Sequence, residues 1–444
     1  MRHKTILVAG LLFVSLWMGC GKTENKDLTV NLPTSLQVSE DVSASAPTLT
    51  PTSVLELVTA VPTLSNTPAP ATDPGLTATP TPTSKPTPTN TPTPTPTPKP
   101  SVTLVMVGDI LLHTRIHAYS VQEDGTYNYD TIFENLKEKI SGADLALVNQ
   151  EVVIGGEKLG ISGYPTFNSP FEAGNALVEA GFDVALHATN HALDKGKKGL
   201  LNTIAFWEEK YPEIGVLGIH DSAESQNELY IVEIEGIRIA ILNYTYGTNG
   251  ISMPKDMPYA VDMLEKDMVI EDIKQAKEQA DFVIVCPHWG TEYRLEPDRN
   301  QKKWTEIFLE QGVDLVLGTH PHVIEPIEWL TREDTGEQML VYYSLGNFVN
   351  WTSGTGAGIA NRMIGGMAEV TIELDENGEA YIADYGVEAV VCHVEPKING
   401  ITVYSLAEYT EQLADNNAIR SQDENFSLEY CVELCNKIWN ELWK

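Results

Sequence analysis

Apolar runs that end in polar residues recur along the chain from residue 102 onward. Continuous apolar runs with such boundaries are typical of buried strands. Five runs predict strands, and polar residues come at the carboxyl end of each: residues 102–109, 143–151, 182–191, 281–288 and 313–322. The fourth run ends in His288, and the fifth ends in His320 and His322.

Segments with helical spacing of apolar residues separate the predicted strands. We expect helices over residues 132–140, 170–178, 200–207 and around 304–308, with Ser169 and Pro170 as N-cap and first-turn residues. Later segments predict hairpins and one further strand, at residues 230–242, 370–381 and 338–348. Alternating strands and helices followed by hairpins predict an α/β fold with mixed sheets.

The polar residues at the strand ends are the candidates for a functional site, because ligands bind at the carboxyl ends of strands in α/β sheets. They are Asp109, Asn149, Glu151, Asn190, His191, His288, His320 and His322. Histidines two positions apart beyond a strand tend to point the same way. Pro321 between them restricts the backbone. A common edge would therefore gather carboxylate, amide and imidazole groups.

These groups favour a metal site without thiolate ligands, which suits Mn, Fe, Zn or a similar divalent ion. Their number exceeds what one ion needs, and two ions about 3.5–4 Å apart would use them all. Other interpretations stay open for single residues. Asp109 could close a turn after Gly108, Asn190 could be a helix N-cap, and the histidines could be core residues.

The N-terminus has the pattern of a secretory signal peptide. Residues 1–20 contain Arg2 and Lys4, an apolar run from Ile6 to Met18, and then Gly19 and Cys20. This apolar run is too short for a comfortable membrane span. A cysteine after a small residue here resembles the lipobox of bacterial lipoproteins, which predicts a lipid on Cys20. An uncleaved short anchor is the alternative, and it also places the domain outside the cell.

Residues 21–100 predict a disordered stalk. They are rich in Thr and Pro, as in the repeat from Thr91 to Pro98, and they show no apolar periodicity to bury. Alternating proline favours an extended conformation of roughly 3 Å per residue.

The remaining chain divides into a predicted domain at 101–394 and a C-terminal helical segment at 395–444 that packs on it.

The charge of the protein limits its partners. The formal net charge is −33 and the pI is about 4.5, which argues against nucleic-acid binding. An anionic substrate would be repelled at long range, so local cations or a metal must bind it. No CxxC pair occurs among the later cysteines, and their pairing is left open. These are Cys286, Cys392, Cys431 and Cys435.

Six short motifs together resemble one family. They are Gly108-Asp109, Asn149-Gln150-Glu151, residues 188–194, residues 288–293, residues 318–322 and residues 343–348. With these motifs in order, residues 102 to about 350 resemble the CapA family of capsule-synthesis proteins. This family is associated with poly-γ-glutamate and belongs to the calcineurin-like metallophosphoesterase superfamily. The resemblance implies a four-layer α/β/β/α sandwich of mixed sheets with metals at one edge.

The resemblance also implies roles for residues. Asp109 would bind the first metal, Asn190 the second, and Glu151 would bridge them. His288, His320 and His322 would complete the metal ligands. Asp109 and His191 are the expected catalytic residues, with His191 as general acid or phosphate contact. The residues expected to support the ligands by hydrogen bonds are Asn149, Asp194, Glu292 and Asn347.

The first motif departs from the superfamily, which usually has a histidine two residues after the aspartate. Leu111 stands there, and His113 lies two residues further on. The second motif is Asn-Gln-Glu instead of Gly-Asp. The first metal site is therefore expected to be weaker, or the domain to bind a single ion.

These observations predict a metal-dependent, phosphoesterase-like hydrolase anchored by lipid to the outer face of the bacterial cytoplasmic membrane. It would act in synthesis or processing of a capsule polymer such as poly-γ-glutamate. Its expected partners are an anionic cell-surface polymer or phosphoester substrate and membrane proteins of capsule synthesis or export. The alternative is a non-catalytic, metal-binding accessory subunit of that synthesis or export complex. A degenerate structural domain would bind no metal.

Overall fold

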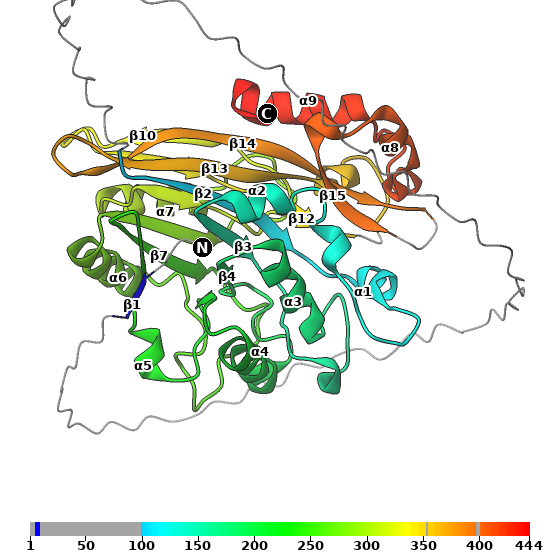
Figure 1. The fold of residues 1–444 in the computed structure, drawn as a ribbon, viewed down its shortest axis with the longest axis horizontal. Helices are drawn as coiled ribbons and strands as arrows, with labels where there is room; N and C mark the ends of the chain where they lie inside the picture. The colour runs from blue at the N-terminus through cyan, green and yellow to red at the C-terminus, as the bar shows by residue number, and fades with distance from the viewer. Residues whose placement is uncertain (1–4, 9–98, 352–353, 397–399) are drawn as a thin grey trace, which may run out of the picture. The chain divides into compact units, whose positions relative to one another are not determined.

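The computed structural model describes residues 5–8, 99–351, 354–396 and 400–444. The predicted lipidation residue Cys20 and residues 21–98 of the predicted stalk lie outside these ranges. Across the described ranges, no helix is both long and apolar enough to cross a bilayer. Figure 1 shows the described elements as a ribbon coloured along the chain.

The first sheet combines a parallel centre with antiparallel edges. Its strands, in spatial order, are β1 (Thr5–Val8), β6 (Tyr230–Ile234), β7 (Ile237–Thr245), β8 (Phe282–His288), β9 (Leu315–Leu317), β11 (Gln338–Tyr342) and β10 (Ile327–Thr331). The four strands from β7 to β11 in this order run parallel. The remaining neighbours, β1 with β6, β6 with β7 and β10 with β11, are antiparallel.

The second sheet is also mixed. Its order is β15 (Ile401–Ser405), β14 (Ala380–Val394), β13 (Ile364–Leu374), β2 (Ser101–Ile110), β3 (Leu145–Asn149), β4 (Val184–Leu186) and β5 (Gly215–Leu217), with β12 (Asn347–Val349) beside the end of β2. The strands from β2 to β5 run parallel, and β13 to β15 continue the sheet antiparallel. Both sheets thus direct several parallel strand ends toward one edge.

Helices flank the two sheets. The α-helices of the described residues are α1 (Thr114–Ser120), α2 (Lys137–Gly142), α3 (Phe171–Ala180), α4 (Gly196–Lys210), α5 (Ala223–Gln226), α6 (Lys266–Gln279), α7 (Arg299–Glu310), α8 (Glu411–Asn416) and α9 (Leu428–Trp439). The short 3₁₀ helices are η1 (Asp130–Ile132), η2 (Glu157–Leu159), η3 (Ile359–Met363), η4 (Leu406–Glu408), η5 (Ala418–Ser421) and η6 (Asn440–Leu442).

The alternation of side chains along β7 shows how the layers pack. Ile239 and Ile241 belong to the large core that also contains buried residues of β2 and β3. Ala240 and Leu242 point to the other face, where they pack with Phe308 of α7 and with buried residues of α6. Buried residues of α2 and α3 join those of β3 and β4 in the large core. The predicted four-layer α/β/β/α sandwich of mixed sheets is confirmed.

The C-terminal segment contributes to this core. Phe426 and Trp439 are buried, and the indole Nε1 of Trp439 donates to the carbonyl of Glu325 at 3.0 Å. In Figure 1, α8 and α9 (red) lie beside the end of the second sheet that contains β14 and β15. The segment also includes the strand β15, which the helical sequence pattern did not predict. The domain boundaries at 394 and 395 stay predictions.

Several predicted elements differ in the structure. The strand predicted over 313–322 is confined to β9 (Leu315–Leu317), and the helix predicted over 132–140 begins at Lys137 in α2. The strand predicted over 338–348 is divided into β11 and β12, which belong to different sheets, because the chain turns at Gly346 with φ of 65°. The strand predicted over 182–191 is confined to Val184–Leu186, and the residues after it form the loop that contains Asn190. Ser169 is not the cap of α3, which begins at Phe171 after Pro170.

Candidate metal centre

The predicted site residues converge at the shared edge of the two sheets. Asp109 at the end of β2 lies in register with Asn149 of β3 and Asn347 of β12. His288 is the last residue of β8, and the loop after β9 contains His320 and His322. The predicted ligand and catalytic residues are all buried, namely Asp109, Glu151, Asn190, His191, His288, His320 and His322.

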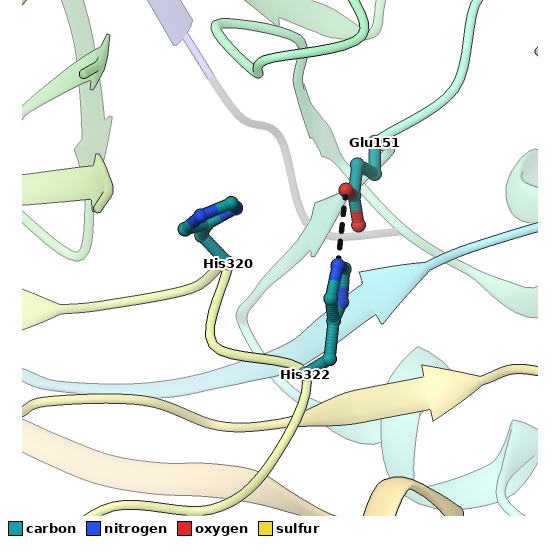
Figure 2. A group of neighbouring side chains, drawn as sticks. All are labelled: Glu151, His320 and His322. Atoms are coloured by element: carbon teal, nitrogen blue, oxygen red, sulfur yellow. Dashed lines mark ion pairs between the residues drawn. The ribbon is translucent and has the colours of Figure 1, made fainter. Parts of the chain in front are cut away.

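Glu151 is the centre of the cluster. Both of its carboxylate oxygens are buried and have no hydrogen-bond partner. Its Oε1 lies 3.7 Å from Nε2 of His322, 3.8 Å from Nε2 of His288 and 3.9 Å from Nε2 of His191. Figure 2 shows the carboxylate facing the ring of His322. A buried carboxylate left without partners is costly, so this arrangement fits a site that binds a cation.

The separations within the cluster fit metal ligands. Two ligand atoms that are each roughly 2.0–2.2 Å from one ion lie no more than about 4.4 Å apart. The distances of 3.7 to 3.9 Å from Glu151 fall within that limit and are too long for hydrogen bonds. Ligand atoms of Glu151, His320 and His322 all lie within 4.8 Å of one another. Oxygen and imidazole donors in this set suit a divalent ion.

The loop that presents the two histidines has an unusual backbone. His320 and His322 have φ angles of 99° and 58°, in the region that L-residues seldom adopt. Such strain persists where surrounding contacts impose it, often at functional sites. The backbone N–H of His320 faces Asp109 Oδ1 at 3.3 Å, while its ring Nδ1 is buried without a partner. That nitrogen is available to a ligand.

Amide side chains hold Asp109 and His322 in place. Asn149 Nδ2 donates to Asp109 Oδ1 at 2.8 Å. His322 Nδ1 lies 3.1 Å from both Asp109 Oδ2 and Asn347 Oδ1. Asn347 Nδ2 also donates to the carbonyl of His322 at 3.0 Å. These contacts direct Nε2 of His322 toward Glu151, as expected of residues that orient metal ligands.

Burial and neighbouring charge set the protonation of the histidines. Burial, followed by the nearby His320 and His322, lowers the pKa of His288 well below its usual value. Burial likewise lowers the pKa of His320, which keeps a neutral imidazole able to bind metal. Burial alone would lower the pKa of His322, but the charges of Glu151 and Asp109 raise it to about 9. Burial raises the pKa of Glu151, although His322 opposes this.

The loop after β4 supplies Asn190 and His191. Asn190 Oδ1 lies 3.0 Å from Nε2 of His288. His191 Nδ1 lies 2.7 Å from Asp194 Oδ2, and this carboxylate also accepts the backbone N–H of Phe167. When Nδ1 of His191 donates to Asp194, its Nε2 faces the cluster and can accept or release a proton there.

The remaining predicted residues lie around the centre. Leu111 is buried in the core, and His113 packs edge-on against Phe167, 5.1 Å between ring centres. Burial, followed by His322 and His191, lowers the pKa of His113 to about 3. Glu292 is exposed at the rim, where its side chain bonds to Tyr293.

Sequence reasoning missed several neighbours of the cluster. Thr319 Oγ1 lies 3.1 Å from Nδ1 of His288, and its position beside His320 could have indicated it. Tyr246 packs on His320 with ring centres 4.5 Å apart, directly after β7. Since β7 is parallel to β8, the carboxyl ends of both strands lie at the same edge, and the residues after β7 could have been included among the candidate site residues. The sequence around Arg362, a cation near these residues, has no local pattern that indicates a site residue.

The fold is a two-sheet α/β sandwich, and the site is a candidate metal-ligand cluster at the strand ends. The family model described as "Bacterial capsule synthesis protein PGA_cap" matches residues 103–352, and the chain belongs to this family. The sequence resemblance to CapA proteins is confirmed.

Two curated relatives are similar to the same part of the chain. The capsule biosynthesis protein CapA of Bacillus anthracis is 28% identical over 263 residues, which cover 56% of this chain and 61% of the relative. The PGA biosynthesis protein CapA of Bacillus subtilis is 28% identical over 256 residues, covering 55% and 63%. The chain thus matches less than two thirds of the length of these relatives.

Solved structures with a related fold include nucleotidases. The NAD nucleotidase NadN of Haemophilus influenzae has a TM-score of 0.41 at 15% identity, covering 78% of this chain and 63% of that one. The 5′-nucleotidase precursor of Thermus thermophilus has a TM-score of 0.38 at 14% identity, covering 66% and 54%.

Proposed function

We propose that the chain is a metal-dependent hydrolase of the phosphoesterase type that acts on an anionic polymer of the cell surface. The observation that supports this most directly is the carboxylate of Glu151, buried without a hydrogen bond among three imidazoles. A structural core would satisfy such a group, whereas a cation-binding site leaves it available.

Asp109 would hold the first metal and Asn190 the second, Glu151 would serve both, and His288, His320 and His322 would complete the ligands. Divalent ions in such a site supply Lewis acidity and lower the pKa of a bound water. Mn, Fe and Zn all suit this donor set. The chain's own residues then position the substrate and transfer the protons.

His191 is the proposed general acid. Asp194 fixes the ring through Nδ1 at 2.7 Å, so a proton on Nε2 faces the cluster. This nitrogen can donate its proton to the leaving oxygen or nitrogen of a phosphoester or amide. The edge of the Phe167 ring packs against His191, 4.7 Å between centres, and restricts its orientation. The burial of His191 limits the access of bulk water.

The substrate class and location follow from similarity and from the N-terminal pattern. Relatives named for capsule and PGA biosynthesis support a capsule polymer such as poly-γ-glutamate as the biological context. A lipid on Cys20 would attach the chain to the outer face of the bacterial cytoplasmic membrane, beside membrane proteins of capsule synthesis or export.

A second candidate function is that of a non-catalytic accessory subunit that uses its metal to hold polymer carboxylates. The observation in its favour concerns the first metal position. Leu111 is buried in the core where the superfamily usually has a histidine, and the ring of His113 packs on Phe167. A site with a single ion could bind anions without efficient hydrolysis.

Turnover of phenyl phosphate by the full-length chain, loaded separately with Mn²⁺, Fe²⁺ and Zn²⁺, distinguishes the two candidates. We expect stoichiometric metal and metal-dependent turnover that His191→Ala abolishes. His393→Ala removes a buried histidine that bonds to Tyr409, and serves as the control. Bound metal without turnover, and no effect of His191→Ala, would favour the accessory role. Absence of bound metal would contradict both.

A further inference from the structure

Two tyrosines lie at the rim of the candidate metal centre. Tyr246 packs on His320 and Tyr293 packs on His322, with ring centres 4.5 Å and 5.9 Å apart. They are 46% and 45% exposed, so both rings face solvent while contacting buried histidines. Tyr293 has a left-handed backbone with φ of 67°, and its N–H donates to the carbonyl of Pro321 at 2.7 Å. This rim is therefore built onto the histidine loop.

A cation is stacked on this rim. The guanidinium carbon of Arg362 lies 3.5 Å from the ring centre of Tyr293. Burial is the main cause of the lowered pKa of His113 and of the raised pKa of Tyr293. The charge of Arg362 adds to the first shift and opposes the second, so it acts on the rim. A guanidinium that stacks on an aromatic ring keeps its N–H donors at its edge, where they can bind carboxylate or phosphate oxygens in pairs.

The backbone of Arg362 is tied to the histidine loop. Asn347 Nδ2 donates to the carbonyl of Arg362 at 2.9 Å and to the carbonyl of His322 at 3.0 Å. One amide group thus fixes the segment that contains the cation relative to a proposed metal ligand. Such preorganisation lowers the conformational cost of binding a ligand across both elements.

The C-terminal segment holds the other side of η3, the short helix that contains Arg362. The buried carboxylate of Asp423 accepts the backbone N–H groups of Gly358 and Ala360 at 2.9 and 3.3 Å. The hydroxyl of Tyr430 in α9 donates to Asn361. Both η3 and these partners lie beyond residues 103–352, the part matched by the family model. Arg362 and these C-terminal partners therefore all lie outside the region that the family model matches.

We propose that Arg362, stacked on Tyr293, binds an acidic group of the substrate other than the one that reacts at the metal centre. This inference rests on the proposed function and narrows its substrate class to molecules with at least two anionic groups. The net charge of −33 and the exposed Glu292 on the same rim repel anions, so binding requires a cation at this position. A polymer of acidic units supplies such a second group on the neighbouring unit.

Isothermal titration calorimetry of the Mn²⁺-loaded full-length chain tests the inference with phosphonates that are not hydrolysed. The probes are phenylphosphonate and its 3- and 4-carboxy derivatives, which add a second anion at two positions. We expect at least one carboxylated probe to bind roughly tenfold more tightly than phenylphosphonate, as a charge-assisted contact provides. Arg362→Ala should abolish this preference, so that it binds phenylphosphonate and its carboxylated derivatives with equal affinity.

Arg294→Ala is the matched control, because Arg294 is an exposed cation one residue after Tyr293. It should retain the preference, and thermal unfolding should show that both variants fold. An equal preference in wild type and Arg362→Ala, or no preference in the wild type, would overturn the subsite alone if phenylphosphonate still binds. If none of the three phosphonates binds to the metal-loaded chain, the proposed function fails, and the subsite fails with it.

Discussion

Buried histidines occur in two kinds of surroundings in this molecule. Away from the sheet edge, the Nε2 atom of His187 accepts the indole N–H of Trp207 at 2.9 Å. His393 pairs with the hydroxyl of Tyr409 at 2.9 Å through Nδ1 and with Glu395 at 3.2 Å through Nε2. At the sheet edge, three imidazoles instead face the carboxylate of Glu151 at distances beyond a hydrogen bond.

The difference shows that burial of a histidine does not by itself indicate function. His187 and His393 have hydrogen-bond partners, which is the usual state of buried polar groups. In the candidate centre, polar atoms from separate strands converge and leave both oxygens of Glu151 and Nδ1 of His320 without partners. A buried carboxylate without a hydrogen bond among converging imidazoles is what distinguishes the candidate centre from these two histidines.

The largest expected effect comes from removing the central carboxylate. In the metal-free protein, Glu151→Gln should change stability little, because it keeps the size of the side chain and neither oxygen of Glu151 has a hydrogen bond to lose. Saturating Mn²⁺, at roughly a thousand times its Kd, should stabilise the wild type by about 4 kcal/mol. We expect the variant to lose most of this, measured by thermal unfolding with and without metal.

His187→Gln provides the matched control from the satisfied region. Its amide oxygen can still accept the N–H of Trp207, so the metal-induced stabilisation should remain. An undiminished metal response in Glu151→Gln would show that the unpaired carboxylate is not a ligand.

The next effect concerns catalysis. His191→Gln should lower the turnover of phenyl phosphate, whose phenolate leaving group is basic, by roughly 10²- to 10⁴-fold, because general acid catalysis supplies a factor of that size. Metal content, measured by elemental analysis of the same sample, should stay stoichiometric. A variant with wild-type turnover would remove His191 from the proposed chemistry.

A smaller effect is expected from the residue that orients His191. Asp194→Asn retains an oxygen for the ring N–H but removes the charge, so turnover should fall by about tenfold. Asp194 Oδ2 lies 2.7 Å from Nδ1 of His191, so the substitution acts on turnover through the ring that it orients. The kcat of the metal-loaded variant measures this, and a wild-type kcat would contradict the role of Asp194.

The smallest effect is expected in the pH dependence of the free energy of unfolding, through the core residue His187. Burial lowers the pKa of His187 to about 3, whereas the unfolded chain binds this proton near pH 6.5. Its contribution to stability is therefore present above pH 6.5 and is lost as pH falls toward 3, at up to about 1.4 kcal/mol per pH unit. His187→Gln should lose less stability than the wild type between pH 6.5 and 4, as measured by urea unfolding in EDTA. Equal slopes would show that His187 is protonated in the folded state.

The central strands of the two sheets, and most of the polar residues at their carboxyl ends, could be predicted from sequence. The strands β2, β3 and β8 are continuous apolar runs, and their polar ends identified Asp109, Glu151 and His288. Local patterns carried this information because buried parallel strands are apolar on both faces.

Other features depend on contacts between distant segments. The division of residues 338–348 between two sheets requires the tight approach of Gly346 to β2, where its carbonyl accepts the N–H of Asp109 at 2.9 Å. Arg362 reaches Tyr293 only because η3 is held by Asn347 and Asp423. Periodicity in the sequence reflects local structure and does not predict such contacts between distant segments.

The most direct test of the metal centre is anomalous X-ray scattering from crystals of the full-length chain grown with Mn²⁺ or Zn²⁺. We predict an anomalous peak roughly 2.0–2.2 Å from a carboxylate oxygen of Glu151, bound also by His320 and His322. A map without a peak among these side chains at saturating metal would contradict the account.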